Sequence, residues 1–213
     1  QVKLSLVRFI AGQSGDEAAL DEMQRFINQQ PHNHTLQFAL ARMHQQLGQS
    51  GAAIGIYEEV IARQGLKPDG LTARIQLAEL YSKVGRNAEA MSLLTEVLAE
   101  SPDNRSALAL RGTIHLSERN APAAITDLRA AMRDAADSTS LRLNLARAYA
   151  INNELDQAVE TIKHAVSLQP NDLGLREEYI RLLALMDDRE AVVAQLDEVL
   201  KISPDNLVAM EAL

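Results

Sequence analysis

Three kinds of short motif bring together side chains that could do chemistry. The first, Gly-Gln-Ser-Gly, occurs at 12–15 and again at 48–51. A serine between glycines is part of a nucleophile elbow, which requires Gly-x-Ser-x-Gly on a turn from a strand to a helix. Both copies instead fall between two helical patterns. We therefore interpret each copy as a turn with a helix cap.

The second motif is a histidine cluster at 31–35, where the sequence reads Pro-His-Asn-His-Thr. His32 and His34 are two residues apart and could share a metal ion, and His44 follows one helix later. No acidic residue or third histidine stands at helical ligand spacing, as a His-Glu-x-x-His site would require. We therefore expect no metal site, a core-edge position for His115 and a solvated one for His164.

The third motif is a set of adjacent carboxylates at 58–59, 177–178 and 187–188. Paired acids do acid–base chemistry only in a pocket that separates their pKa values. These pairs fall on predicted helix surfaces or turns, and the sequence contains no glycine-rich phosphate loop. We therefore expect solvated carboxylates, no enzyme activity and no cofactor.

Composition narrows the class of protein. The 213 residues are 46% hydrophobic, which is enough for a buried core, and carry a net charge of −8. That charge and an aromatic content of 3% argue against a nucleic-acid partner. Arg181 interrupts the most apolar stretch, 179–186, so we expect no membrane-spanning helix. Cysteine is absent, which excludes disulfides and thiolate metal sites. The chain begins at Gln1, which we interpret as a processed or partial chain.

The elements that would position any site follow a period of 34 residues. Alanine recurs at 19, 53, 90, 124 and 158, and Ser-Pro-Asp-Asn at 101–104 returns at 203–206. Fixed periods of this size indicate a repeat architecture. One step is lengthened by three residues within 63–70, and Ala136 stands where one unit would have a proline.

Each unit contains two amphipathic helical patterns, such as 71–84 and 88–101, which are separated by a short turn. Proline ends the second helix, and the Asp or Asn that follows can cap the next one. Small residues should let the two helices approach closely. They are Ala41, Ala78, Gly112 and Ala146 on first helices, and the five periodic alanines on second helices. Val7 and Ile180 replace the small residue in the outer units, which we expect to pack less tightly.

Residues 77–104 and 145–172 carry Leu-Ala, then Tyr, then Ala and a closing Pro, and so resemble the tetratricopeptide repeat. The resemblance covers units at 1–33, 34–70, 71–104, 105–138, 139–172 and 173–206, with a partial unit at 207–213. It implies an all-α fold, a right-handed α-solenoid of antiparallel helix pairs in one domain. The aromatic residue expected early in the first helix is missing, and its places hold Gln37, Arg74, Leu108, Arg142 and Arg176.

The resemblance also implies that the first helices line a concave groove where a ligand lies. The residues that follow the small position form a ladder of Arg8, Arg42, Glu79, Thr113, Arg147 and Arg181. Gln76 and Asn144 stand three residues before Glu79 and Arg147 and share their face. We expect an extended or helical peptide there, because Asn can bond its backbone and Arg its carboxylates. Arg147 should lack an acidic partner, and Glu177 should pair with Arg181.

These features favour a protein-interaction scaffold for an acidic protein or peptide. The alternative is a substrate-positioning or sugar-polymer-binding module of a larger bacterial envelope or exopolysaccharide-export protein. The likeness to bacterial repeat proteins of the cell envelope favours periplasm or envelope over cytoplasm. At the C-terminal end, Leu207, Met210 and Leu213 should cover the preceding helix near Val199 and Leu200. The apolar surface left there favours end-to-end self-association.

Overall fold

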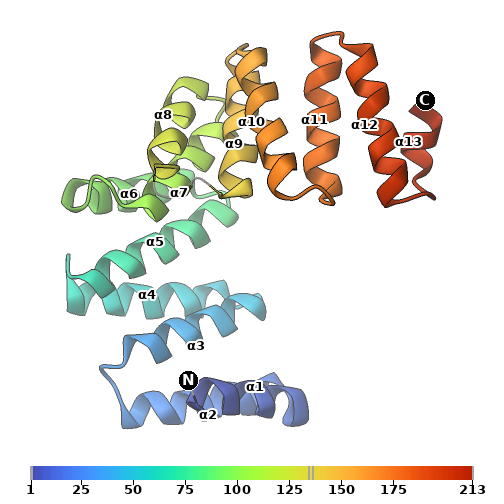
Figure 1. The fold of residues 1–213 in the computed structure, drawn as a ribbon. Coiled ribbons are helices and arrows are strands. Elements are labelled where there is room, and N and C mark those ends of the chain that lie inside the picture. The colour runs from blue at the N-terminus through green and yellow to red at the C-terminus, as the bar shows by residue number, and fades with distance from the viewer. Residues whose placement is uncertain (1, 134, 136, 213) are drawn as a thin grey trace. The chain divides into compact units, whose positions relative to one another are not determined.

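The computed structural model describes residues 2–133, 135 and 137–212, and these form thirteen α-helices and no strand. From α1 to α6 and again from α7 to α13, consecutive helices run in opposite directions and are joined by short connections (Figure 1). The predicted all-α class is therefore confirmed. The helices are α1 (Val2–Ser14), α2 (Asp16–Gln29), α3 (His34–Gln46), α4 (Ser50–Gln64), α5 (Pro68–Lys83), α6 (Asn87–Glu100), α7 (Arg105–Ser117), α8 (Ala121–Ala131), α9 (Thr139–Ile151), α10 (Leu155–Leu168), α11 (Leu173–Leu185), α12 (Arg189–Ile202) and α13 (Leu207–Ala212). Ala136 and Leu213, named above, lie outside the described residues.

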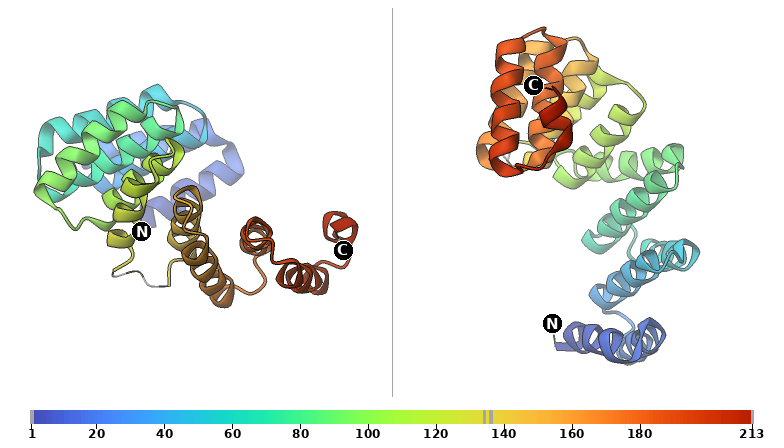
Figure 2. Two further views of the ribbon diagram at one scale, coloured as in Figure 1. Left: turned by 90° about the horizontal axis from the view of Figure 1, so that it is seen from above. Right: turned by 90° about the vertical axis from the view of Figure 1, so that its right-hand side faces the viewer.

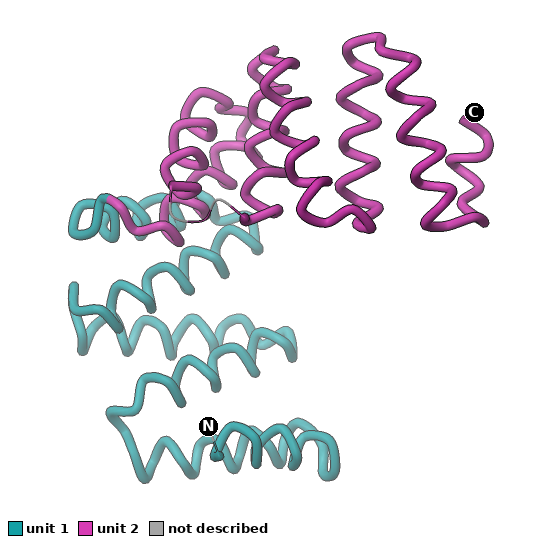
Figure 3. Tube along the Cα trace, viewed as in Figure 1, with its two compact units in different colours: residues 1–102 teal, residues 103–213 magenta. Residues whose placement is uncertain are grey.

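The chain divides into two compact units, residues 1–102 and residues 103–213, called unit 1 and unit 2 below (Figure 3). Unit 1 contains α1 to α6 and unit 2 contains α7 to α13. Within each unit every helix packs against the next helix along the chain, as the two views of Figure 2 also show. In unit 2 the first helix α9 also contacts the first helices α7 and α11 on either side of it. These three helices therefore contribute to one face of unit 2.

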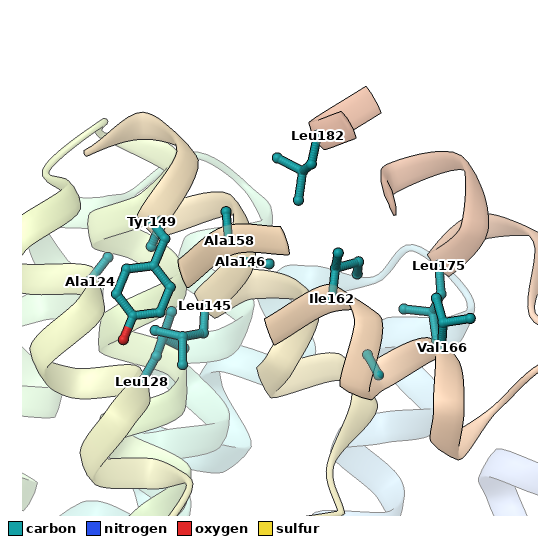
Figure 4. Close-up of a cluster of buried hydrophobic side chains, with 12 residues drawn as sticks. Ala124, Leu128, Leu145, Ala146, Tyr149, Ala158, Ile162, Val166, Leu175 and Leu182 are labelled. Carbon is teal, nitrogen blue, oxygen red and sulfur yellow. The ribbon is translucent and has the colours of Figure 1, made fainter. Parts of the chain in front are cut away.

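The small residues predicted from the period lie where the helices of a pair cross. Ala41, Ala78 and Ala146 on first helices and all five periodic alanines on second helices are completely buried. Gly112 meets the same need, since a Cβ atom there would lie 2.8 Å from Cγ of Leu128. In unit 2, Ala146 and Ala158 belong to one core cluster that also contains Ile162 and Leu182 (Figure 4).

The turn inside most helix pairs has one backbone pattern. The residues at 48, 85, 119, 153 and 187 have positive φ, and the N–H of the following residue donates to the carbonyl five residues back. This is the Schellman ending of a helix, in which glycine is favoured. Gly48 and Gly85 provide it in unit 1, whereas unit 2 uses Arg119, Asn153 and Asp187. Unit 2 therefore places ordinary side chains where the left-handed conformation costs free energy.

The two Gly-Gln-Ser-Gly motifs stand at turns between helices, as predicted, and each contains the N-cap residue of the following helix, which is not the serine. Ser14 is the last residue of α1 and Ser50 is the first of α4. Gly15 and Gln49 occupy the N-cap positions, and neither forms a side-chain cap hydrogen bond. Gly15 and Gly48 have φ values of 88° and 72°, so the glycines are needed for the backbone and not for a reactive serine.

Side-chain caps occur at the loops between pairs, where the sequence predicted them, and also at Asp188 within the α11–α12 pair. Asn33, Asn104 and Asp172 each accept a hydrogen bond from the backbone N–H three residues later. The loop with three added residues, within 63–70, differs from this pattern. The helix that follows it, α5, begins at Pro68, three residues before the expected start, with Lys67 at the N-cap and no side-chain cap. Pro68 suits this first position because its missing N–H has no partner there in any helix.

Helix α13 packs on α12, but not through the residues predicted. Ala209 is buried and belongs to a small cluster with Leu196 and Val199. Leu207 and Met210 are exposed, because α13 turns Ala209 and not its larger side chains toward α12. In the outer repeats, Val7 is buried and Ile180 is partly buried against the α12–α13 cluster.

Candidate functional site

The ladder residues lie on the first helices, each directly after a residue that is buried or, before Arg181, partly buried. Arg8, Arg42, Thr113, Arg147 and Arg181 are exposed, and Glu79 is partly exposed. The residues before Arg42, Glu79, Thr113 and Arg147 are small and buried, which fixes the direction in which the ladder side chains leave the helix. Arg8, Arg42 and Glu79 belong to unit 1, and the other three belong to unit 2.

In unit 2 two ladder arginines line a cavity of about 440 Å³. Its walls come from α7, the turn after it, α9 and α11, and α9 contacts both of the other two helices. The lining residues are Leu116, Arg119, Arg147, Ala150, Ile151, Glu178, Arg181 and Leu185. The lining thus contains three guanidinium groups and one carboxylate, and aliphatic residues form the rest of the wall. We call this cavity the unit 2 pocket.

Glu178 is the organising residue of the unit 2 pocket. Its carboxylate accepts two hydrogen bonds from Arg181, at 2.5 Å and 3.2 Å, and Oε1 lies 3.4 Å from Nε of Arg147 on α9. The Glu178 side chain is 8% exposed, whereas those of Arg147 and Arg181 are about half exposed. Burial raises the pKa of Glu178, but the hydrogen bond and charge of Arg181, with Arg147, outweigh burial and hold that pKa below its ordinary value.

Two predictions about these arginines are wrong. Arg147 was expected to have no acidic partner, yet it pairs with Glu178, because the partner comes from the next first helix and not from its own turn. Arg181 was expected to pair with Glu177, yet its partner is Glu178, three residues before it. The expectation of solvated carboxylates also fails at Glu178, which faces the pocket while Glu177 is exposed.

Asn144 and Thr113 are also brought together in unit 2. The side-chain amide of Asn144 donates to Oγ1 of Thr113 at 3.2 Å. The two residues are 31 positions apart, and so are Arg147 and Glu178. In both pairs the ladder residue of one first helix contacts a residue of the following first helix. That residue stands three positions before the ladder residue of the following helix. One N–H of the Asn144 amide is therefore directed at Thr113 and not at a ligand.

Unit 1 places its predicted residues in two groups. Arg42 and Arg8 line a separate cavity of about 260 Å³ between α1 and α3. Gln76 and Glu79 lie on α5, where the Glu79 carboxylate accepts a hydrogen bond from Lys83 at 2.6 Å. The structure therefore does not bring Gln76 and Glu79 into the cavity of Arg8 and Arg42.

Sequence reasoning missed Arg119 and Glu178. Glu178 could have been found from the repeat, because it stands 34 residues after Asn144, which itself was placed beside the ladder. Arg119 had a weaker signal, namely that it stands 34 residues after Gly85, in a turn that favours glycine. Leu116, Ile151 and Leu185 end the apolar stripes of their helices, and Leu185 and Ile151 remain exposed.

In the histidine motif at 31–35, the His34 side chain contacts two other side chains of the protein. His34 Nδ1 lies 2.5 Å from Oδ2 of Asp69, and its Nε2 lies 3.3 Å from Nε2 of Gln64. In the described part of the chain, no group of three His, Cys, Asp or Glu side chains could hold a metal ion. His115 is partly buried and His164 exposed, as expected. Over the same residues, no helix combines the length and the apolar character needed to cross a membrane.

Two profiles described as tetratricopeptide repeat match residues 48–114 and 110–172, and together they span more than half of the chain. The chain belongs to the tetratricopeptide repeat family. The fold of this TPR chain also resembles solved structures. MamA from Desulfovibrio magneticus RS-1 has a TM-score of 0.73 at 18% identity, over 83% of this chain and 98% of that one.

Two further TPR structures are similar. A tetratricopeptide repeat protein from Parabacteroides merdae ATCC 43184 gives a TM-score of 0.73 at 20% identity, over 94% of this chain and 78% of that one. YrrB, described as a TPR protein with an unusual peptide-binding site, gives a TM-score of 0.69 at 17% identity, over 89% of this chain and 96% of that one. These likenesses confirm the predicted solenoid of helix pairs.

Proposed function

We propose that this TPR chain is a non-catalytic interaction scaffold whose unit 2 pocket binds an acidic segment of a partner protein. The carrying observation is the charge of that pocket, which is lined by three arginines, Arg119, Arg147 and Arg181, and by one carboxylate, that of Glu178. The excess of guanidinium groups stands out in a chain with a net charge of −8. Repeat solenoids bind partners along extended surfaces made by successive units, and the pocket spans three successive first helices.

Glu178 gives the pocket a defined geometry. Because Glu178 is buried and bonded to both guanidinium groups, it holds Arg147 and Arg181 in place with N–H groups left over. A ligand carboxylate can then accept charge-assisted hydrogen bonds from donors whose positions are already set. The aliphatic residues Leu116, Ile151 and Leu185 provide contact for an apolar side chain of the same segment.

The test uses a fluorescent peptide with blocked ends that carries several Glu residues and one Leu in a Gly/Ser background. Wild-type protein should bind this peptide and not its Gln counterpart, with affinity that falls as salt rises. Arg147→Gln and Arg181→Gln should each weaken binding by about tenfold or more, the value of a charged hydrogen bond. Arg189→Gln is the matched control, because Arg189 is an exposed arginine of α12 outside the pocket.

Circular dichroism of each variant establishes that the fold is unchanged. Equal binding of the Glu and Gln peptides by wild-type protein would overturn the proposal. So would wild-type affinity in both pocket variants, because the charge of this pocket would then play no part in recognition.

A further inference from the structure

We propose that unit 1 binds an arginine side chain of a partner protein in a groove between its second helices α4 and α6. This site, called the unit 1 groove, is a cavity of about 350 Å³ whose lining includes Glu58, Ile61, Leu77, Tyr81, Glu89 and Leu93. The ladder residues do not line it. The inference goes beyond the proposed function, because it concerns the second helices and a partner segment of the opposite charge.

The floor of the unit 1 groove is apolar. Helices α4 and α6 each pack against α5, and side chains of α5 form the bottom of the cavity between them. Of these, Leu77 and Tyr81 are 2% and 7% exposed. Ile61 on α4 and Leu93 on α6 are partly buried and form the apolar part of the walls. The methylene stem of a long cationic side chain can lie along such a surface while its charge stays at the edge.

The rim of the unit 1 groove is acidic, with one exposed carboxylate on each second helix. Glu89 on α6 accepts a hydrogen bond from Arg86 at 2.8 Å, and this bond holds the pKa of Glu89 below its ordinary value. Glu58 on α4 forms no ion pair with any described residue, whereas its neighbour Glu59 pairs with Arg63. The carboxylate of Glu58 is therefore left uncompensated.

The acidic rim is particular to this groove and does not follow from the 34-residue repeat. Glu58 stands five residues after a periodic alanine, and Glu89 stands one residue before the next periodic alanine. In the other pairs of successive second helices, the residues at these two positions are Gln24 and Ala52, Thr95 and Ala123, Arg129 and Gln157, and Lys163 and Ala191. The two glutamates are therefore not required to build a helix pair, and this favours a role in binding.

These features together select arginine. A planar guanidinium group has N–H donors on more than one side, so it can bond a carboxylate from α4 and another from α6. Its stem gains free energy by leaving water against Ile61 and Leu93. A small cation would leave the apolar floor uncovered, and an aliphatic side chain would leave Glu58 uncompensated. A lysine ammonium is a compact point charge and is less suited to two carboxylates on separate helices.

Isoleucine methyl groups allow the site to be observed directly. Ile61 lines the unit 1 groove, whereas Ile125 is a partly buried isoleucine of α8 outside it. Protein labelled with ¹³C at the isoleucine δ1 methyl groups is titrated with an end-blocked peptide that has one Arg in a Gly/Ser background. A second peptide carries citrulline, an uncharged isostere, in place of Arg. The Ile61 signal, assigned from Ile61→Val, should shift with the Arg peptide only, and the Ile125 signal should shift with neither.

Removal of either carboxylate should weaken binding of the Arg peptide. Glu58→Gln and Glu89→Gln should each lower the affinity obtained from the Ile61 shift by about threefold to fivefold, as for an exposed ion pair. Glu59→Gln is the matched control, because it removes the same charge from the next residue of α4, which does not line the groove. It should bind as wild type does, and so should Arg147→Gln.

Three results would overturn the proposal. They are an Ile61 signal that does not shift with the Arg peptide, equal binding of the citrulline peptide, and a loss in Glu59→Gln as large as that in Glu58→Gln. The last result would mean that binding follows the net charge of the protein and not this groove. None of the three bears on the unit 2 pocket, which is tested with the Glu peptide, so the two proposals can fail separately.

Discussion

Arg74 donates a hydrogen bond from its guanidinium group to the carbonyl oxygen of Gly65 at 2.6 Å. The same side chain bonds Oε2 of Glu96 at 2.7 Å, so it ties α5 both to the preceding loop and to α6. Two other 34-residue repeats have a corresponding contact. Arg176 bonds the carbonyl of Pro170 at 2.8 Å, and the Gln37 amide bonds the carbonyl of Pro31 at 3.4 Å. All three residues stand at the position where the family has an aromatic side chain.

Replacing Arg74 tests whether this contact stabilises unit 1. Arg74 is 8% exposed, so Arg74→Met keeps the buried stem but leaves the Gly65 carbonyl and Glu96 without their donor. We expect the free energy of unfolding in urea to fall by about 1.5–3 kcal/mol, the value of charged hydrogen bonds. Arg63→Met is the control, because Arg63 forms only an exposed pair with Glu59 and should change stability little. Equal effects of the two substitutions would contradict the role given to Arg74.

Gly112 should be intolerant of even one added methyl group. A Cβ atom there would lie 2.8 Å from Cγ of Leu128, which is completely buried and cannot move aside. Gly112→Ala should therefore destabilise the protein by about 1–3 kcal/mol, as overpacking does. Gly55→Ala is the matched change, since Gly55 lies inside α4 with no atom within 4 Å of its Cβ position. It should stabilise by roughly 0.5–1 kcal/mol through helix propensity, and thermal unfolding of both variants would show opposite shifts.

Glu178 should make stability depend on pH in a defined direction. Its pKa is held below the ordinary value in the folded protein, so its contribution is complete above the pKa of an unfolded Glu, about 4.3. That contribution is lost as the pH falls through the lower folded pKa. The difference in unfolding free energy between wild type and Glu178→Gln should therefore be constant near neutral pH and shrink below about pH 4.3. Glu177→Gln, at the exposed neighbour, should show no such trend, and a parallel trend in both would refute the assignment.

Replacing Arg119 by glycine should raise the stability of the protein and weaken its binding of the peptide. It has a φ of 59° in a turn where Gly48 and Gly85 serve the same purpose, and its side chain lines the unit 2 pocket. Arg119→Gly should raise the free energy of unfolding by about 1 kcal/mol and weaken binding of the Glu peptide. Asp187→Gly removes the same backbone cost outside the pocket, so its binding should equal that of wild type. If Arg119→Gly binds as tightly as wild type, the side chain is not retained for the pocket.

Self-association through the C-terminal helix stays a prediction. Leu207, Val208 and Met210 are exposed on α13, because only Ala209 is turned toward α12. We expect sedimentation velocity to show association that rises with concentration, and Val208→Lys to reduce it. Val84→Lys, at an exposed valine in unit 1, should leave the association unchanged. A single sedimentation boundary of the monomer at all concentrations would contradict the predicted self-association.

The 34-residue period was sufficient to predict the helix pairs, the buried small residues and several helix caps. Ala41, Ala78 and Ala146 were placed in the core from spacing alone, because close helix crossing leaves room only for small residues. The caps at Asn104 and Asp172 follow from local chemistry in the same way. The pairing of Arg147 with Glu178 could not be predicted from helical neighbours, since it joins two helices and depends on how α9 and α11 are offset. Local spacing of three or four residues contains no information about that offset.

The contacts of Gln37, Arg74 and Arg176 also bear on how such a chain changes length. Gln37 and Arg176 reach a carbonyl six residues earlier, whereas Arg74 reaches one nine residues earlier, across the three added residues. The hydrogen bond to the loop carbonyl is thus made by a long side chain and does not require a fixed number of residues in the loop. Loops between pairs can therefore accept extra residues while the helices on either side keep their packing. Insertions, tags or cleavage sites engineered into this chain belong near 65–67, and the Schellman turns within pairs should be left intact.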